Sequence, residues 1–411
     1  MAILRPFQGI LPNNKLAQSV SCPPYDVISS KEAQLMAKDN PNSFLRIIKP
    51  EINSNEVNSI TDIHQYASNL LKDFIKNGIL KKDLNNCFYL YQIKMGDHEQ
   101  TGIIAATSIN EYNQNKIKKH EYTRPDKEND RTQHIKITQT NTGPVFLTFK
   151  NDGHYSNIIK NVQDYRPYIN FEAEDNTEHT IWRINDLEKQ NQIIDYFQSI
   201  SNLYIADGHH RAASAARVQN YFQNKNPKHK GNEPYNFFLS VIFPDNEMKI
   251  LDYNRIIKDL NGLSEKQLIN LIKKNFFISR IDKNKPTKIN NFSMLLNNNW
   301  YNLESKRNIL CNDPVDSLDA SILQNYLLEP ILGIDNPRTN KRIDFIGGIR
   351  GLEELERRCN TDAAIAFALY PVSINDLFCV ADANKVMPPK STWFEPKLRS
   401  GLVVRSIKGN D

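Results

Sequence analysis

Apolar residues return along the chain at two spacings, which predict helices and strands in alternation. Between residues 60 and 76 they recur every three or four positions, as on one face of a helix, and Gly78 marks its end. The apolar runs 88–95 and 100–108 flank Gly96 and Asp97 and predict two antiparallel strands joined by a turn. Further strands are expected at 44–48, 145–149, 180–184, 203–206, 236–243, 250–252 and 363–369. Further helices are expected at 30–38, 131–140, 212–221, 264–275, 320–328 and 352–358.

This alternation of strands and helices favours an α/β or mixed α+β fold. Soft boundaries near positions 150 and 250 divide the chain into three expected regions, 1–150, 151–250 and 251–411, although no Gly/Ser-rich linker marks either boundary. The asparagine-rich tract 283–299 is expected to lie on the surface as a polar, low-complexity segment.

The composition argues against a membrane protein and against a secreted protein. The chain has 411 residues, of which 39% are hydrophobic, and no apolar run approaches the roughly 18 residues of a membrane span. Its first residues lack the pattern of a secretory signal, and its five cysteines form no C-x-x-C pair. We therefore expect a cytoplasmic protein with reduced thiols and no membrane partner. The net charge of +5 over this length is too small to argue for a nucleic-acid partner.

The sharpest chemical motif is the segment 204–211, Tyr-Ile-Ala-Asp-Gly-His-His-Arg, which precedes an alanine-rich helix. Gly208 permits a tight turn between a buried strand and that helix, whose free N–H groups and dipole favour an anion. His209, His210 and Arg211 add donors, and Asp207 could hold Mg²⁺ or accept a proton. In the alternative interpretation Asp207 only caps the helix and both histidines lie on the surface.

A second motif is the loop segment 120–127, His-Glu-Tyr-Thr-Arg-Pro-Asp-Lys, which precedes a helix. Such a loop could supply a carboxylate base and a cationic clamp. The alternative is an ordinary solvated loop.

Two proline-rich segments could also present side chains. The segment 23–27, Pro-Pro-Tyr-Asp-Val, is stiff and could present Tyr25 and Asp26, unless Asp26 only caps the next turn. The segment 387–392, Met-Pro-Pro-Lys-Ser-Thr, lacks the glycines of a P-loop, but its Lys390 could belong to a closing loop. Alternatively, this segment packs Trp393 and Phe394 into the core.

These segments, in this order and together with Arg5-Pro6-Phe7, resemble a widespread bacterial family catalogued as domain of unknown function ten-fifteen, over nearly the whole chain. The Asp-Gly-His-His-Arg segment is also similar to the nucleotide loop of the ParB/sulfiredoxin superfamily, and within it to the free serine kinases. The resemblance implies a ParB-like nucleotide-binding core in 151–250, with α/β additions on both sides.

The resemblance also implies roles for particular residues. The nucleotide phosphates would lie near Gly208, His209, His210 and Arg211, with Asp207 near Mg²⁺ or the transferred group. The base would be Glu121, or as second choice Asp26, and His210 and Lys390 would help to neutralise charge. A further set of residues is expected to bind the substrate, namely Tyr25, His120, Thr123, Arg124 and Lys127.

The function expected from these residues is that of a small-molecule kinase that uses ATP or ADP with Mg²⁺. L-serine is the first choice of acceptor, and another hydroxylated metabolite is the alternative. A nucleotide-binding switch without catalysis is the competing hypothesis, and a nucleic-acid-associated protein ranks below it. A homodimer is compatible with the sequence but is not indicated by it.

Overall fold

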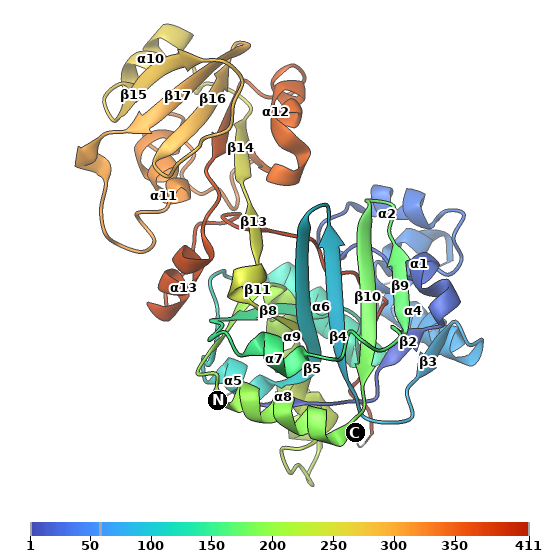
Figure 1. Ribbon diagram of the computed structural model, residues 1–411. Helices are drawn as coiled ribbons and strands as arrows, with labels where there is room; N and C mark the ends of the chain where they lie inside the picture. The colour runs from blue at the N-terminus through green and yellow to red at the C-terminus, as the bar shows by residue number, and fades with distance from the viewer. Residues whose placement is uncertain (1, 57–59, 410–411) are drawn as a thin grey trace. The chain divides into compact units, whose positions relative to one another are not determined.

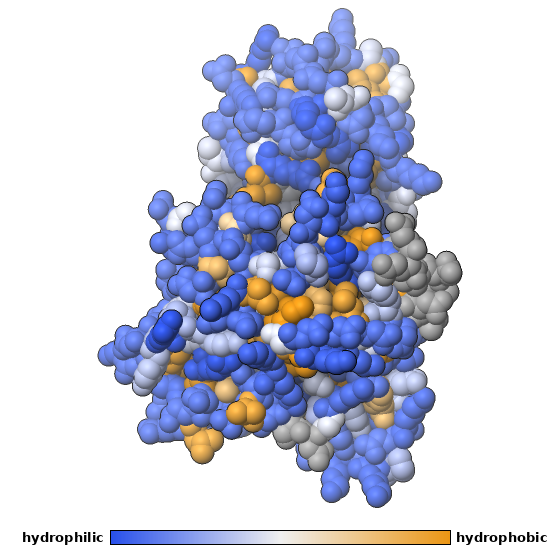
Figure 2. All heavy atoms as spheres, turned by 90° about the vertical axis from the view of Figure 1, so that its right-hand side faces the viewer, coloured by the Kyte–Doolittle hydropathy of each residue, from blue (hydrophilic) through white to orange (hydrophobic). Residues whose placement is uncertain are grey.

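The computed structural model describes residues 2–56 and 60–409, which divide into two compact units. Unit 1 comprises Met1–Met248 and Pro396–Asp411, and unit 2 comprises Lys249–Glu395 (Figure 1). Both units combine helices with sheets, which confirms the mixed α/β fold class. Among the described residues, no helix is both long and apolar enough to cross a membrane. Most residues on the face drawn in Figure 2 are hydrophilic.

Unit 1 is built around a mixed sheet to which nine strands of the described chain contribute. Strands from both of the expected regions 1–150 and 151–250 take part, so these two regions share one sheet. In spatial order the sheet runs β6 (Ile117–Lys118), β11 (Leu203–Asp207), β8 (Val145–Phe149), β12 (Phe237–Pro244), β5 (His98–Ser108), β4 (Phe88–Met95), β10 (Thr177–Ile184) and β9 (Ile169–Glu172), with β1 (Leu4–Arg5) beside β5.

Capping residues and first-turn residues mark where two helices of unit 1 begin. The Ser29 side chain caps α2 in a reciprocal capping box with Glu32. Pro125 occupies the first turn of α6, followed by Asp126 and Glu128. These acidic side chains interact favourably with the positive end of the helix dipole. The helices are α1 (Ala17–Val20), α2 (Ser30–Ala37), α3 (Leu45–Ile48), α4 (Ile60–Lys76), α5 (Ile109–Asn113), α6 (Pro125–Thr138), α7 (Tyr155–Ile159), α8 (Leu187–Ser199) and α9 (His209–Lys225).

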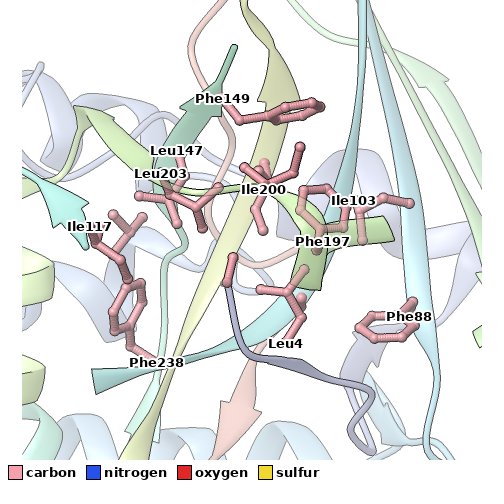
Figure 3. Packing of buried hydrophobic residues seen from close by; sticks show 14 of the residues in the cluster. Leu4, Phe88, Ile103, Ile117, Leu147, Phe149, Phe197, Ile200, Leu203 and Phe238 are labelled. Atoms are coloured by element: carbon pink, nitrogen blue, oxygen red, sulfur yellow. The ribbon is translucent and has the colours of Figure 1, made fainter. Parts of the chain in front are cut away.

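The core of unit 1 joins the sheet to its helices (Figure 3). Phe197 from α8 packs with Phe149 from β8, and their ring centroids lie 5.3 Å apart. The buried alanines of α9, among them Ala212 and Ala215, let this helix pack closely against β8 and β12. Full burial of one Leu, Ile or Phe side chain stabilises a fold by roughly 1.5–3 kcal/mol, so this cluster holds the sheet and helices together.

The last segment of the chain returns to unit 1. Val404 bridges to Ile10 and Ser400 bridges to Cys22. Strand β21 (Arg405–Ser406) pairs with β7 (Thr140–Asn141), and the other small pair of this unit is β2 (Ile10–Pro12) with β3 (Leu80–Lys82). This return places residues after 395 among the first 30 residues of the chain.

Unit 2 contains an antiparallel sheet of six strands within the residues described. In spatial order these are β15 (Phe276–Ile281), β17 (Asn299–Ser305), β16 (Asn291–Leu296), β19 (Ile365–Leu369), β14 (Tyr253–Ile257) and β18 (Ile343–Gly347). A separate pair joins β13 (Lys249–Leu251) to β20 (Trp393–Glu395). The helices are α10 (Glu265–Ile272), α11 (Asp319–Leu323), α12 (Gly351–Cys359) and α13 (Ile374–Asp382).

Two predictions about local structure were wrong. Residues 44–48 were expected as a strand, but Leu45–Ile48 form the short helix α3. The tract 283–299 was expected at the surface, but it contains the strand β16, all six residues of which are buried. Asn290, Asn297 and Asn298 adopt positive φ angles of 64°, 47° and 58° at the ends of this strand. Asparagine tolerates this left-handed conformation, so these residues form turns around a buried strand.

Candidate functional site

Two sequence motifs meet at one edge of the unit 1 sheet because β6 and β11 are parallel neighbours. The segment 119–124 follows β6 and the segment 208–211 follows β11, so both leave the sheet at the same edge. The neighbouring β8 runs antiparallel to β11, and therefore Gly143 and Pro144 enter the sheet there. The edge outside the carboxyl ends of strands is a common place for ligand sites in α/β folds.

Gly208 makes the turn between β11 and α9. Its φ of 94° and ψ of 29° lie in the left-handed region, and it is the N-cap of the helix. A Cβ built on it would lie 3.4 Å from both Arg211 Cζ and Val145 Cα, which is an ordinary van der Waals separation, so the left-handed backbone is what favours glycine here. As an N-cap without a side chain, Gly208 leaves the first N–H groups of a 17-residue helix to other acceptors.

The carboxylate of Asp207 lies beside this turn. Its Oδ1 accepts a hydrogen bond from the N–H of Gly208 at 2.7 Å, and its Oδ2 lies 3.5 Å from Lys397 Nζ. Burial alone would raise the pKa of Asp207, but Lys397, Arg211 and the Gly208 N–H together hold this pKa below its usual range. Asp207 is therefore ionised at neutral pH and suits cation binding better than proton transfer.

Arg211 joins the Pro-Pro-Tyr-Asp segment to the helix. Its guanidinium lies 3.5 Å from Asp26 Oδ2 and donates a hydrogen bond to the carbonyl of Pro144. Burial would lower the pKa of Arg211, but Asp26 and Asp207 raise it, so the charge is retained. Tyr25 lies under another arginine, Arg131, whose Cζ is 4.4 Å from the centre of its ring.

A small cavity lies among these residues. Its volume is about 30 Å³, and Tyr25, Arg131, His134, Arg211 and Ser400 contribute to its lining. This space suits a water molecule but is far too small for a nucleotide.

His120 and His209 form the most deeply buried part of the site. The N–H of His120 donates to His209 Nε2 at 3.4 Å, and the two rings meet edge to face with centroids 4.5 Å apart. Burial lowers the pKa of His120 to about 4 and that of His209 far below its ordinary value. Both imidazoles are therefore neutral at neutral pH. Glu121, next to His120, is half-buried.

The rest of the 120–127 segment contacts the start of α9 and α6. His210 Nε2 accepts a hydrogen bond from the backbone N–H of Arg124 at 2.9 Å. Thr123 donates to Glu128 at 2.7 Å, and the Arg124 guanidinium pairs with Asp126 at 2.9 Å.

Two of the side chains that were expected to bind the substrate already have partners within the protein. The Thr123 side chain is bonded to Glu128 of α6 and the Arg124 side chain to Asp126, whereas Lys127 is exposed on the first turn of α6. Lys390 belongs to unit 2, where its Nζ lies 5.6 Å from the centre of the Tyr253 ring and its φ is 58°. Its phosphate-binding role stays a prediction.

Two residues that the structure places here, Lys397 and Arg131, follow the sequence motifs but were given no role from the sequence. Lys397 follows the Met-Pro-Pro-Lys-Ser-Thr segment by five positions, and a second lysine in that proline-rich stretch was the available signal. Arg131 donates to the Ile48 carbonyl at 2.9 Å and to Asp130 at 2.6 Å. No sequence spacing relates it to Tyr25, because the contact is made across the fold.

The residues present are compatible with a nucleotide phosphate and Mg²⁺. The turn that a Cβ would fill gives a phosphate close access to the backbone at the positive end of α9. Mg²⁺ usually keeps several waters and binds one or two carboxylates together with substrate phosphates. Asp207, which lies near Arg211, provides such a carboxylate.

Comparison with solved structures gives matches of low similarity. A free serine kinase in complex with AMP matches at a TM-score of 0.35 and 13% identity, over 71% of this chain and 86% of that one. A C-terminally truncated SbnI from Staphylococcus aureus matches at 0.37 and 10%, over 75% and 90%. A conserved hypothetical protein from Pyrococcus furiosus matches at 0.36 and 13%, over 74% and 95%.

A comparison with curated proteins gave no match. The family model described as "Protein of unknown function (DUF1015)" matches residues 4–321. This match spans most of the chain, in agreement with the resemblance seen in its motifs. The chain therefore belongs to the DUF1015 family.

Proposed function

We propose that the protein is a phosphotransferase that moves a phosphoryl group from a nucleotide to the hydroxyl group of a small metabolite. The observation that carries this proposal is the parallel pairing of β6 with β11, which brings Glu121 and Asp207 to the amino end of α9. Phosphoryl transfer needs positioned charge more than covalent chemistry, and this edge concentrates carboxylates, cations and the amino end of a helix.

The first turn of α9 binds the nucleotide phosphates in this proposal. Its N–H groups and its dipole, equivalent to about half a positive charge, attract an anion. Gly208 lets the phosphates approach the backbone, and His210 lies on the first turn beside them. Arg211 is engaged by Asp26 and the Pro144 carbonyl, so it contributes positive charge and holds the site together without gripping the phosphate directly.

Mg²⁺ bound with the nucleotide would neutralise phosphate charge, with Asp207 as its protein ligand. Lys397 lies 3.5 Å from Asp207 and orients that carboxylate.

Glu121 accepts the proton of the acceptor hydroxyl in this proposal. It is half-buried beside the neutral imidazoles of His120 and His209, whereas Asp26 is already paired with Arg211. Glu121 is therefore the first choice of base and Asp26 the second. The acceptor we favour is L-serine, because the Asp-Gly-His-His-Arg segment is similar to that of the free serine kinases; Tyr25, His120, Thr123, Arg124 and Lys127 are the expected contacts to it.

The test incubates the purified full chain with ATP or ADP, Mg²⁺ and a panel of hydroxylated metabolites that includes L-serine. Mass spectrometry then detects the dephosphorylated nucleotide and the phosphorylated acceptor. Asp207→Asn and His210→Ala should abolish turnover with little loss of folding. The matched control is His154→Ala, since His154 is an exposed histidine paired with Asp152 away from this sheet edge.

The remaining outcomes separate the competing functions. Nucleotide binding without any phosphorylated product would indicate the non-catalytic switch. Near-normal product formation by both Asp207→Asn and His210→Ala would refute the assignment of the site. If Glu121 is the base, Glu121→Gln lowers kcat while nucleotide affinity is retained, whereas Asp26→Asn has this effect if Asp26 is the base.

A further inference from the structure

Three side chains at the same sheet edge have the composition and spacing of a metal site. His120, Glu121 and His209 can each place one ligand atom within 4.8 Å of the ligand atoms of the other two. They come from the two parallel strands, because His120 and Glu121 follow β6 and His209 follows β11. The set is two imidazole nitrogens and one carboxylate oxygen.

The surroundings prepare both imidazoles to act as ligands. The His120 ring hydrogen-bonds the backbone of Ile205, an interaction that raises its pKa and therefore uses a ring N–H as donor. Such a bond to a carbonyl fixes the tautomer and leaves the opposite nitrogen with a lone pair, as is usual for metal-bound histidines. Both rings are also buried, His120 at 2% and His209 at 6% exposure, so they are held in place by the surrounding fold.

The hydrogen bond between the two histidine residues is long, so it competes only weakly with a metal ion for the His209 nitrogen. The His120 N–H lies 3.4 Å from His209 Nε2, which is longer than the usual 2.7–3.2 Å of an N–H hydrogen bond. A metal that takes the His209 nitrogen would therefore displace little. Glu121 is half-buried, and one of its carboxylate oxygens already lies within 4.8 Å of a nitrogen of each ring.

We infer that His120, Glu121 and His209 bind one divalent transition-metal ion of the zinc class. Two imidazoles with one carboxylate suit Zn²⁺ and its neighbours, whereas Mg²⁺ and Ca²⁺ prefer oxygen ligands alone. Three protein ligands leave a coordination position for water or a substrate oxygen. Metal binding of this kind does not depend on phosphoryl transfer. A Glu121 that ligates a metal cannot at the same time accept a proton, so Asp26 would be the base of the metal-bound protein.

The test measures metal binding by the full chain without nucleotide or turnover. The chelator-treated protein is titrated with Zn²⁺ against a chromophoric competitor, and with Co²⁺ while its visible d–d absorption is recorded. Cys311 and Cys379 are exposed thiols, so both are changed to serine in every variant to remove adventitious binding. We expect one Zn²⁺ per chain, unaffected by excess Mg²⁺.

Two variants decide whether these residues are the ligands. Glu121→Gln should weaken Zn²⁺ binding at least about tenfold, since loss of even an outer-shell partner costs about 10–100-fold. The matched control Glu128→Gln, which changes a carboxylate on α6, should leave the affinity unchanged. Far-ultraviolet circular dichroism checks that each variant is folded. Absence of stoichiometric Zn²⁺ and Co²⁺ binding, or equal affinity in the wild type and Glu121→Gln, would overturn the inference.

Discussion

Replacing Arg211 with methionine should destabilise unit 1 strongly, because its guanidinium lies between two carboxylates. Arg211 exposes 11% of its side chain and is 3.5 Å from Asp26, which exposes 32%. Removing one partner of a fully buried pair costs about 3–5 kcal/mol, whereas exposed pairs contribute about 0–1 kcal/mol. Asp26 and Asp207 keep some contact with water, so we expect a loss of about 2–3 kcal/mol in the free energy of unfolding.

The assay is urea denaturation of the full chain followed by tryptophan fluorescence. Trp300 and Trp393 are in unit 2, so changing both to phenylalanine leaves Trp182 of β10 as the reporter of unit 1. Arg217→Met is the matched control on the same helix, because Arg217 exposes 45% of its side chain and pairs with Glu128 at 3.2 Å. That variant should lose no more than about 1 kcal/mol.

A double-mutant cycle separates the structural role of Arg211 from a role in ligand binding. Asp26→Asn combined with Arg211→Met should cost clearly less than the sum of the two single changes, because each single change leaves a charge without its partner. If Arg211→Met costs no more than Arg217→Met, the reasoning is refuted, and Arg211 would have to be explained by direct contact with a ligand.

Three further predictions concern other parts of the fold. Gly208→Ala should lower the free energy of unfolding by roughly 1–2 kcal/mol, because alanine is strained in the left-handed conformation. A urea midpoint equal to that of the wild type would contradict this prediction. Phe197→Ala should cost about 3–5 kcal/mol in the same assay, and a loss below about 1 kcal/mol would contradict its place in the core. Burial and the charge of Asp376 raise the pKa of Asp319 to about 7. The folded state prefers the protonated form of Asp319, so unit 2 should lose stability as pH rises from about 4 to 7. The loss should be at most about 1.4 kcal/mol per pH unit, and Asp319→Asn should remove this dependence. For this measurement Trp182 is changed to phenylalanine and Trp300 and Trp393 are kept as reporters of unit 2. If the stability of Asp319→Asn followed pH as that of the wild type does, the assignment would be wrong.

Local chemistry explains which elements could be read from the sequence. The helix at 60–76, the strands at 88–95 and 145–149 and the cap at Ser264 all depend on residues within one or two turns of each other. The segment 44–48 was wrongly predicted as a strand because a short apolar run has no distinguishable period. In the fold, Arg46 donates hydrogen bonds to the carbonyls of Ala37 and Asn40, and this contact fits a helical turn.

The candidate site was predictable as separate motifs but not as an assembly. The turn at Gly208 could be anticipated because a strand, a glycine and a helix follow one another. The parallel pairing of β6 with β11 could not, because β6 has only two residues and its partner lies more than 80 positions later. The same holds for Lys397, which reaches Asp207 only after the chain has formed the whole of unit 2.

The return of residues 396–411 has a consequence for biosynthesis. The Asp207 turn is synthesised long before Lys397, so for much of translation Asp207 has Arg211 nearby but lacks Lys397, and Ile10 lacks its bridge to Val404. Domains usually fold as they emerge, from the amino end onward. Unit 1 is the first unit to be synthesised, but its last residues are the last to be added. A chain interrupted anywhere in Lys249–Glu395 would lack Lys397 at the site.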